Sequence, residues 1–172
     1  MASVASFFVS RIETLADRLL AERAGTNPDA AQLQGKVAVA AAKLAYREYR
    51  RLRDSREWRT LLGAGARVQR PLWASTSTKN PEYSDIKYVE ALIGPETVTT
   101  LPLATIEAYR DHGQPAPRLT TDMPEAETVF ANLNKFGIDF AALARQLETE
   151  GVAKFIASYQ QLLAALSQAA SA

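Results

Sequence analysis

Hydrophobic residues follow two patterns along the chain, and the two patterns alternate. Short apolar or β-branched runs at 4–10, 68–74 and 97–101 predict strands, because each is too short for a helix and is bounded by turn residues. Between them, apolar residues recur at spacings of three and four, which predicts helices over 12–21, 30–52, 58–62, 86–93 and 102–109. The order β, α, β, α, β, α is typical of a parallel sheet covered by helices.

The character of the chain changes after residue 113. Prolines at 115, 117 and 124 predict a linker, and helices follow over 125–136, over 139–147 and from Gly151 onward. The last helix has regular apolar spacing, at Val152, Phe155, Ile156, Tyr159, Leu162, Leu163 and Leu166. We expect residues 114–172 to form a helical extension that packs on the sheet region, 1–113. A partner-binding amphipathic helix is the alternative.

The first predicted strand begins almost at the first residue. A strand buried on both faces normally has a neighbour on each side. Three parallel strands leave both edges of a sheet open, and open edges favour association with a second copy or aggregation. We therefore expect this chain to be part of a larger sheet.

Composition narrows the classes of function. The chain has 172 residues, 47% of them hydrophobic, and a net charge of +1, so no global field favours nucleic acid or a membrane surface. Basic residues near the end of the 30–52 helix are interleaved with acids, which indicates a solvated face. The absence of cysteine excludes thiolate chemistry and is compatible with a cytoplasmic location. One histidine, His112, leaves little room for a histidine metal site, and its predicted loop position indicates no role.

Candidate chemistry follows the second predicted strand. Residues 75–80 hold a run of hydroxyls that begins at Ser75 and ends with Lys79 and Asn80. In parallel α/β sheets ligands bind at the carboxyl ends of the strands. Hydroxyls and one cation suit a phosphorylated, polyhydroxylated substrate. A solvent-exposed polar turn is the alternative.

The first predicted strand offers a second set of candidates. Ser6 and Phe8 share one face of the strand, and Arg11 follows its carboxyl end. A guanidinium at that position can bind a phosphate through two parallel hydrogen bonds. The alternative is a surface arginine that pairs with Glu13 or Asp17.

The residues around these candidates resemble a known family. Residues 73–85 read Trp-Ala-Ser-Thr-Ser-Thr-Lys-Asn-Pro-Glu-Tyr-Ser-Asp, which resembles a motif of bacterial transaldolases. Residues 3–11 resemble the sixth barrel strand of that family, and residues 88–95 and 97–102 resemble the elements that lead into and form the eighth. The resemblance covers essentially the whole chain.

This resemblance implies a fold and an activity. The fold is α/β: the C-terminal three βα units of a (β/α)8 barrel, followed by a helical cluster. The activity is transfer of a dihydroxyacetone unit between sugar phosphates in the pentose phosphate pathway, through a Schiff base on a lysine. Neither a metal nor an organic cofactor is implied.

The resemblance also assigns residues. Ser6, Phe8 and Arg11 match a pattern that lines the substrate site, with Arg11 on the phosphate. Ser75 belongs to the same site, and Lys79-Asn80 falls where much of the family has Arg-Asn. Lysine keeps the charge but loses the guanidinium's paired donors.

The Schiff-base lysine of the family lies on the fourth strand, so we expect it upstream of this chain, which then contains no catalytic residue. The implied partners are sugar phosphates and the missing N-terminal half of the barrel. Alternatives are a non-catalytic sugar-phosphate-binding module and an inactive truncated product.

Overall fold

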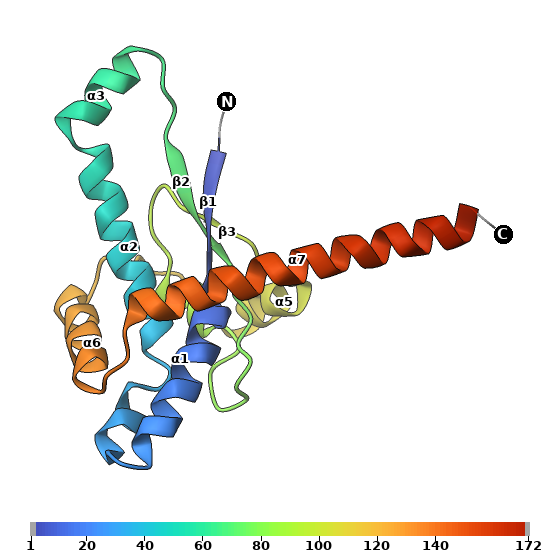
Figure 1. Ribbon diagram of the computed structural model, residues 1–172. Helices are drawn as coiled ribbons and strands as arrows, with labels where there is room; N and C mark the ends of the chain where they lie inside the picture. The colour runs from blue at the N-terminus through green and yellow to red at the C-terminus, as the bar shows by residue number, and fades with distance from the viewer. Residues whose placement is uncertain (1–2, 171–172) are drawn as a thin grey trace. The chain divides into compact units, whose positions relative to one another are not determined.

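The computed structural model describes residues 3–170 (Figure 1). Positions 1–2 of the expected sheet region and 171–172 of the expected helical extension lie outside the described residues. The chain forms two compact units, Met1–Ile138 and Asp139–Ala172, and each is considered by itself. The expected division between residues 113 and 114 stays a prediction.

Unit 1 is built around a three-stranded parallel sheet. Its strands are β1 (Ser3–Phe8), β2 (Gln69–Ala74) and β3 (Val98–Thr99), in the order β1-β2-β3. Phe8 pairs with Ala74, and Leu72 pairs with Val98. The predicted α/β class and parallel pairing are confirmed. The first strand ends two residues earlier than predicted, because the chain turns directly into a helix at Val9.

The two faces of the sheet differ in environment. Phe7 and Trp73 lie on the face turned toward the helices, where their rings meet edge to face with centroids 5.6 Å apart. Trp73 is 1% exposed. Because side chains alternate along a strand, Ser6 and Phe8 lie on the other face. Phe8 is 37% exposed there, so this face is not covered as a core would be.

Helices follow each strand, as predicted. They are α1 (Val9–Ala24), the 3-10 helix η1 (Pro28–Leu33), α2 (Val37–Arg53), α3 (Arg56–Gly63), α4 (Lys87–Ala91), α5 (Leu103–His112), α6 (Met123–Lys135) and α7 (Phe140–Ala170). The single helix predicted over 30–52 is wrong, because the chain breaks between η1 and α2. Gly35 causes the break: its φ is +73°, a conformation that residues with a side chain rarely adopt.

The core of unit 1 lies between the helices. α2 packs against α6 and α1, and α1 packs against η1. The buried apolar side chains of this layer include Leu15, Leu20, Leu33, Val37, Ala41, Val129 and Leu133. Alanines along α2 let the neighbouring helices approach closely. Pro124 lies in the first turn of α6 and not in a linker as predicted; that turn needs no N–H from it.

Unit 2 contains one long helix, α7. The prediction of two helices separated at Gly151 is wrong, because α7 continues through that residue. A mid-helix glycine costs only about 1 kcal/mol relative to alanine, too little to end a long helix. Asp139 caps the helix start: its Oδ1 accepts from the Ala141 N–H at 2.8 Å. Between residues 3 and 170 no helix is long and apolar enough to cross a membrane.

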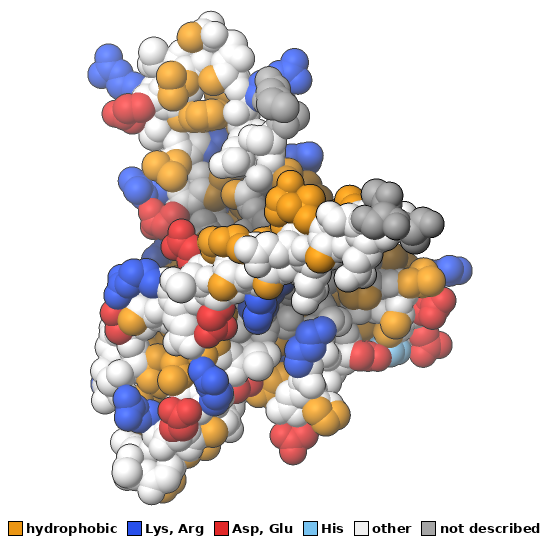
Figure 2. All heavy atoms as spheres, turned by 45° about the vertical axis from the view of Figure 1, so that its right-hand side comes forward, with side chains coloured by type: hydrophobic (Ala, Val, Ile, Leu, Met, Phe, Trp, Pro, Cys, Tyr) orange, Lys and Arg blue, Asp and Glu red, His pale blue; other side chains and the backbone are white. Residues whose placement is uncertain are grey.

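Hydrophobic and charged side chains are interspersed over the surface drawn in Figure 2. On α7 the exposed large apolar side chains are Val152, Phe155, Ile156, Tyr159, Leu162, Leu163 and Leu166. This set is the one whose spacing predicts an amphipathic helix. Packing of this helix on the sheet region stays a prediction, and so does the alternative that the helix binds a partner.

Candidate functional site

The carboxyl ends of β1 and β2 are joined by backbone contacts. β1 ends at Phe8 and α1 begins at Val9, so Arg11 lies in the first turn of the helix. The Ser10 N–H donates to the carbonyl oxygen of Ser75 at 3.0 Å. The structure therefore brings the start of α1 and the segment after β2 to the same edge of the sheet, as the strand order predicts.

Arg11 contacts an aromatic ring. Its guanidinium carbon lies 4.7 Å from the centroid of the Phe8 ring, a cation–π geometry. The two carboxylates considered as its alternative partners bind other groups: Glu13 binds Lys87 and Asp17 binds Tyr83. The side chain of Arg11 is exposed, which leaves guanidinium N–H groups accessible to an anion.

The hydroxyl groups after β2 do not share one environment. Ser75 has a φ of 52°, a left-handed conformation that is uncommon for a non-glycine residue. Thr76 is fully buried, and its hydroxyl donates to the Thr100 carbonyl oxygen at 2.6 Å. Thr76 therefore ties this segment to the one after β3 and is not open to a ligand. The remaining hydroxyls, Ser75, Ser77 and Thr78, are partly exposed.

Lys79 and Asn80 lie further along the same segment. Lys79 is exposed and its Nζ donates to the Ser77 hydroxyl at 2.9 Å. The Asn80 Oδ1 accepts from the Glu82 N–H at 3.0 Å, so this side chain stabilises a turn. Both residues line a pocket of about 200 Å³ together with Glu13, Thr14, Asp17, Tyr83 and Tyr88. Substrate binding stays a prediction for all six candidate residues: Ser6, Phe8, Arg11, Ser75, Lys79 and Asn80.

Sequence reasoning missed a polar cluster in the lining of this pocket. Glu13 and Asp17 lie one helical turn apart on α1. Each carboxylate accepts a hydrogen bond from one backbone N–H, Glu13 from a residue in the first turn of α2 and Asp17 from a residue just before α2. Ala38 donates to Glu13 at 3.0 Å and Gly35 donates to Asp17 at 2.8 Å. The signal in the sequence is the four-residue spacing of the two acids, which by itself indicates only possible partners of Arg11.

The same two carboxylates bind the segment that follows Asn80. The Tyr83 hydroxyl donates to Asp17 at 2.6 Å, and Lys87 Nζ lies 2.8 Å from Glu13 Oε2 and 3.8 Å from the Tyr83 ring centroid. Burial raises the pKa of Tyr83, and the hydrogen bond to Asp17 raises it further. Burial and the nearby Glu13 charge likewise raise the pKa of Tyr88. The phenol groups of Tyr83 and Tyr88 are therefore neutral over the physiological pH range.

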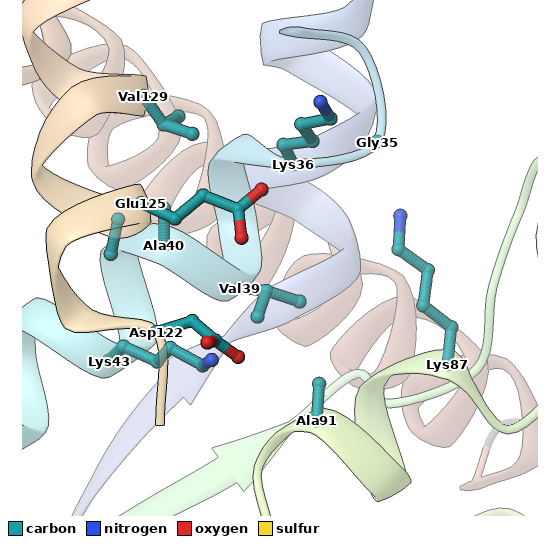
Figure 3. Close-up of a pocket in the computed structure, with 11 residues that line it drawn as sticks. Gly35, Lys36, Val39, Ala40, Lys43, Lys87, Ala91, Asp122, Glu125 and Val129 are labelled. Atoms are coloured by element: carbon teal, nitrogen blue, oxygen red, sulfur yellow. The ribbon is translucent and has the colours of Figure 1, made fainter. Parts of the chain in front are cut away.

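A second pocket, of about 250 Å³, lies beside α2, α4 and α6 (Figure 3). Lys36, Lys43 and Lys87 line it together with Asp122 and Glu125. Two of these lysines are already engaged: Lys43 donates to the Thr121 carbonyl oxygen at 2.9 Å, and Lys87 binds Glu13. Carboxylates beside the ammonium groups make it a poorer anion site than the edge that carries Arg11.

His112 is the last residue of α5 and not part of a loop as predicted. Its Nε2 lies 3.0 Å from Asp85 Oδ1, and its Nδ1 lies 3.2 Å from Asp111 Oδ2. These hydrogen bonds, the one to Asp85 first, raise the pKa of His112. Asp85 lies just before α4 but does not cap it, since no side chain caps that helix. Across residues 3–170 no group of three or more His, Cys, Asp and Glu residues is arranged to hold a metal ion.

Comparison with known proteins now tests the resemblance. Residues 1–166 match the family model of transaldolase/fructose-6-phosphate aldolase. The chain belongs to this family. It is 49% identical over 164 residues to a transaldolase of Parafrankia sp. (strain EAN1pec), a match that covers 95% of this chain and 44% of that protein. It is 45% identical over 175 residues to transaldolase 2 of Nostoc sp. (strain PCC 7120), covering 96% of this chain and 46% of the relative.

A third relative matches the chain to a similar extent. A transaldolase of Mycobacterium tuberculosis (strain H37Rv) is 49% identical over 163 residues, covering 94% of this chain and 43% of the relative. The predicted transaldolase resemblance is confirmed. The chain spans less than half the length of these relatives. The family implies a TIM barrel, and the parallel sheet with its helices is compatible with part of one.

Proposed function

We propose that this chain supplies the phosphate-binding part of a transaldolase active site, which moves a dihydroxyacetone unit between sugar phosphates. The observation that carries the proposal is the shared edge of β1 and β2, where the Ser10 N–H bonds the Ser75 carbonyl oxygen at 3.0 Å. It sets Arg11 and Ser75 at the carboxyl ends of neighbouring parallel strands, where barrel enzymes bind substrate. Arg11 binds the phosphate, and Lys79 adds a second cation.

The strand order supports three consecutive βα units of a barrel. In a barrel each strand pairs in parallel with the next along the chain, as β1, β2 and β3 do here. The exposed Ser6 and Phe8 then belong to the barrel interior. Residues 1–113 form these units, and residues 114–172 form a helical extension that packs on them.

A groove beside β1 supports a missing partner. It has a volume of about 730 Å³ and lies between the helix-facing side of the sheet and the residues of α2 and α3. Within the described part of the chain, three buried polar atoms along it have no hydrogen-bond partner: Tyr49 Oη, Trp58 Nε1 and Trp73 Nε1. Buried donors are normally paired, so the groove and the edge of β1 suit the remaining barrel units.

The reaction also requires that partner. The ketose forms a Schiff base with a lysine, the carbon–carbon bond breaks to release the aldose phosphate, and the dihydroxyacetone unit stays on the lysine until an acceptor aldose takes it. We place that lysine outside this sequence, so the chain alone is inactive. The completed enzyme acts in the pentose phosphate pathway of the cytoplasm, without metal or organic cofactor.

A borohydride trap tests the division of labour. The chain is incubated with fructose 6-phosphate and borohydride, alone and with the part of the Mycobacterium tuberculosis relative that the match does not cover, and both polypeptides are weighed. We expect no adduct on the chain alone and a dihydroxyacetone-sized adduct on the added polypeptide. An adduct on a lysine of this chain, such as Lys79, would overturn the assignment of the nucleophile.

Calorimetry tests the phosphate site itself. Hydrogen bonds to charged groups contribute about 1.5–3 kcal/mol, so Arg11→Ala should weaken fructose 6-phosphate binding by roughly 10- to 100-fold. Arg59→Ala on the exposed surface of α3 is the matched control and should leave binding unchanged. Equal affinity of the Arg11→Ala variant and the unaltered chain contradicts the proposed phosphate contact. Saturable binding without any adduct, even with the added polypeptide, supports a non-catalytic binding module instead.

A further inference from the structure

The segment that carries Lys79 and Asn80 is hydrogen-bonded to other elements both before and after these two residues. Before these residues, the Ser75 carbonyl oxygen accepts from Ser10 in α1, and the buried Thr76 hydroxyl donates to the Thr100 carbonyl oxygen. After them, Tyr83 and Lys87 bind Asp17 and Glu13, which are also in α1. The helix that carries Arg11 therefore holds both ends of the segment that carries Lys79.

The two α1 carboxylates differ from ordinary surface acids. Glu13 is 1% exposed, although carboxylates are rarely fully buried. It bonds the Ala38 N–H, and so caps α2, whose own preceding residue Lys36 makes no side-chain cap. An ionised buried carboxylate needs a cation, and Lys87 supplies it at 2.8 Å.

Gly35 completes this arrangement. Its N–H donates to Asp17 Oδ1, and a Cβ on it would lie 3.0 Å from Tyr83 Cζ and 3.1 Å from Lys87 Nζ. Only glycine lets the turn before α2 approach these two side chains so closely. Asp17, Glu13 and Gly35 thus contact Tyr83 and Lys87 from one side.

We propose that Asp17 and Glu13 are positioning residues that fix Lys79 and Asn80 relative to Arg11, through Tyr83 and Lys87. This inference rests on the proposed phosphate site. In this role the carboxylates bind protein groups: Glu13 accepts from Lys87 and the Ala38 N–H, and Asp17 accepts from Tyr83 and the Gly35 N–H. Their contribution is to restrict the Lys79 segment so that two cations are presented together to one phosphate.

A double-mutant cycle measures this role. Binding of fructose 6-phosphate is measured by calorimetry for the unaltered chain, Tyr83→Phe, Lys79→Ala and the double variant. We expect Tyr83→Phe to weaken binding about five- to twenty-fold, because it removes a hydrogen bond to a charged group. We also expect Lys79→Ala to cost several-fold less in the Tyr83→Phe background. Additive effects would overturn the inference, since a purely structural tyrosine gives no coupling to Lys79.

Two substitutions of Lys87, one that removes its charge and one that keeps it, test the role of the Lys87–Glu13 ion pair. Lys87→Met should weaken binding, and Lys87→Arg, which keeps the cation on Glu13, should restore at least half of the lost affinity on a logarithmic scale. Tyr159→Phe on the exposed side of α7 is the matched control for Tyr83→Phe and should bind as the unaltered chain does. Equal losses for Lys87→Met and Lys87→Arg contradict the positioning role.

Hydrogen exchange separates this inference from the proposed function. If the unaltered chain binds neither fructose 6-phosphate nor inorganic phosphate, the proposed function fails, and the restraint on the segment is judged by exchange alone. Amides of Glu82, Tyr83 and Lys87 are hydrogen-bonded here and should exchange at least about tenfold faster in Tyr83→Phe. The Asp54 amide at the end of α2 should not change. Unchanged exchange of the first three amides overturns the inference.

Discussion

The backbone N–H of Ser10 donates a hydrogen bond to the carbonyl oxygen of Ser75 at 3.0 Å. Ser75 makes this bond from a left-handed conformation, with φ at 52°. The bond joins the first turn of α1 to the segment after β2, and so joins the two sets of predicted phosphate contacts. The left-handed backbone conformation of Ser75 therefore belongs to the contact that joins α1 to the segment after β2.

Substitution of Ser75 tests that conformation. Strained backbone positions cost about 1–3 kcal/mol, and β-branched residues tolerate positive φ least. Ser75→Val should lower the free energy of unfolding by about that amount, whereas Ser75→Gly should be neutral or stabilising. Ser75→Ala separates loss of the hydroxyl from the backbone effect. Urea unfolding followed by circular dichroism gives all three values, and a glycine variant less stable than the valine variant would contradict the expectation.

Much of the fold was predictable because it is local. The strands at Ser3–Phe8 and Gln69–Ala74 and most helices follow from apolar spacing within one element. The break at Gly35 and the continuity of α7 through Gly151 were not, because the two glycines differ only in their surroundings. Gly35 must leave room for Tyr83, whereas a Cβ on Gly151 would meet nothing within 4 Å.

The candidate site was predictable to a similar extent. The places of Arg11 and Lys79 after two neighbouring strands follow from the sequence pattern, whereas their binding of a phosphate stays a prediction. The cluster of Glu13, Asp17 and Lys87 depends on contacts between residues up to 74 positions apart, which no local pattern contains. Such side-chain networks require the packed structure.

The two glycines give a matched pair of variants. Gly35→Ala should destabilise the chain by about 1–3 kcal/mol, because a side chain is strained at φ +73° and meets the Tyr83 ring. Gly151→Ala should stabilise α7 by about 0.5–1 kcal/mol, because it removes a flexible residue from a helix interior. Thermal and urea unfolding measure both. A Gly35→Ala variant that is as stable as the unaltered chain would show that the conformation of Gly35 is not required.

His112 predicts a pH dependence of stability. Its pKa is raised from 6.5 in the folded state by the hydrogen bonds to Asp85 and Asp111. A raised pKa means that the folded state binds the proton more tightly, so the contribution is fully present below about pH 6.5 and is lost as pH rises through the folded pKa. His112→Gln should remove this part of the pH profile. An imidazole titration by NMR should give a folded pKa above 6.5, and Asp85→Asn should lower it more than Asp111→Asn.

The two tryptophans of the chain predict a fluorescence signature. Both line the groove beside β1, and both indole N–H groups are buried without a hydrogen-bond partner among the described residues. Trp73 is 1% exposed and lies against Phe7, whereas Trp58 on α3 is partly exposed. Trp58→Phe, which leaves Trp73, should therefore emit at shorter wavelength and resist acrylamide quenching, and Trp73→Phe should be quenched more readily.

The same two variants report on completion of the barrel. If a further polypeptide covers the groove, acrylamide quenching of Trp58 should fall several-fold in the Trp73→Phe variant when that polypeptide is added. Quenching of Trp73 should change little, because this residue is already shielded. The matched control is Tyr159→Phe in the otherwise unaltered chain, which leaves both tryptophans in place. Unchanged quenching of Trp58 in a mixture that has regained transaldolase turnover would show that the groove stays open in the assembled enzyme.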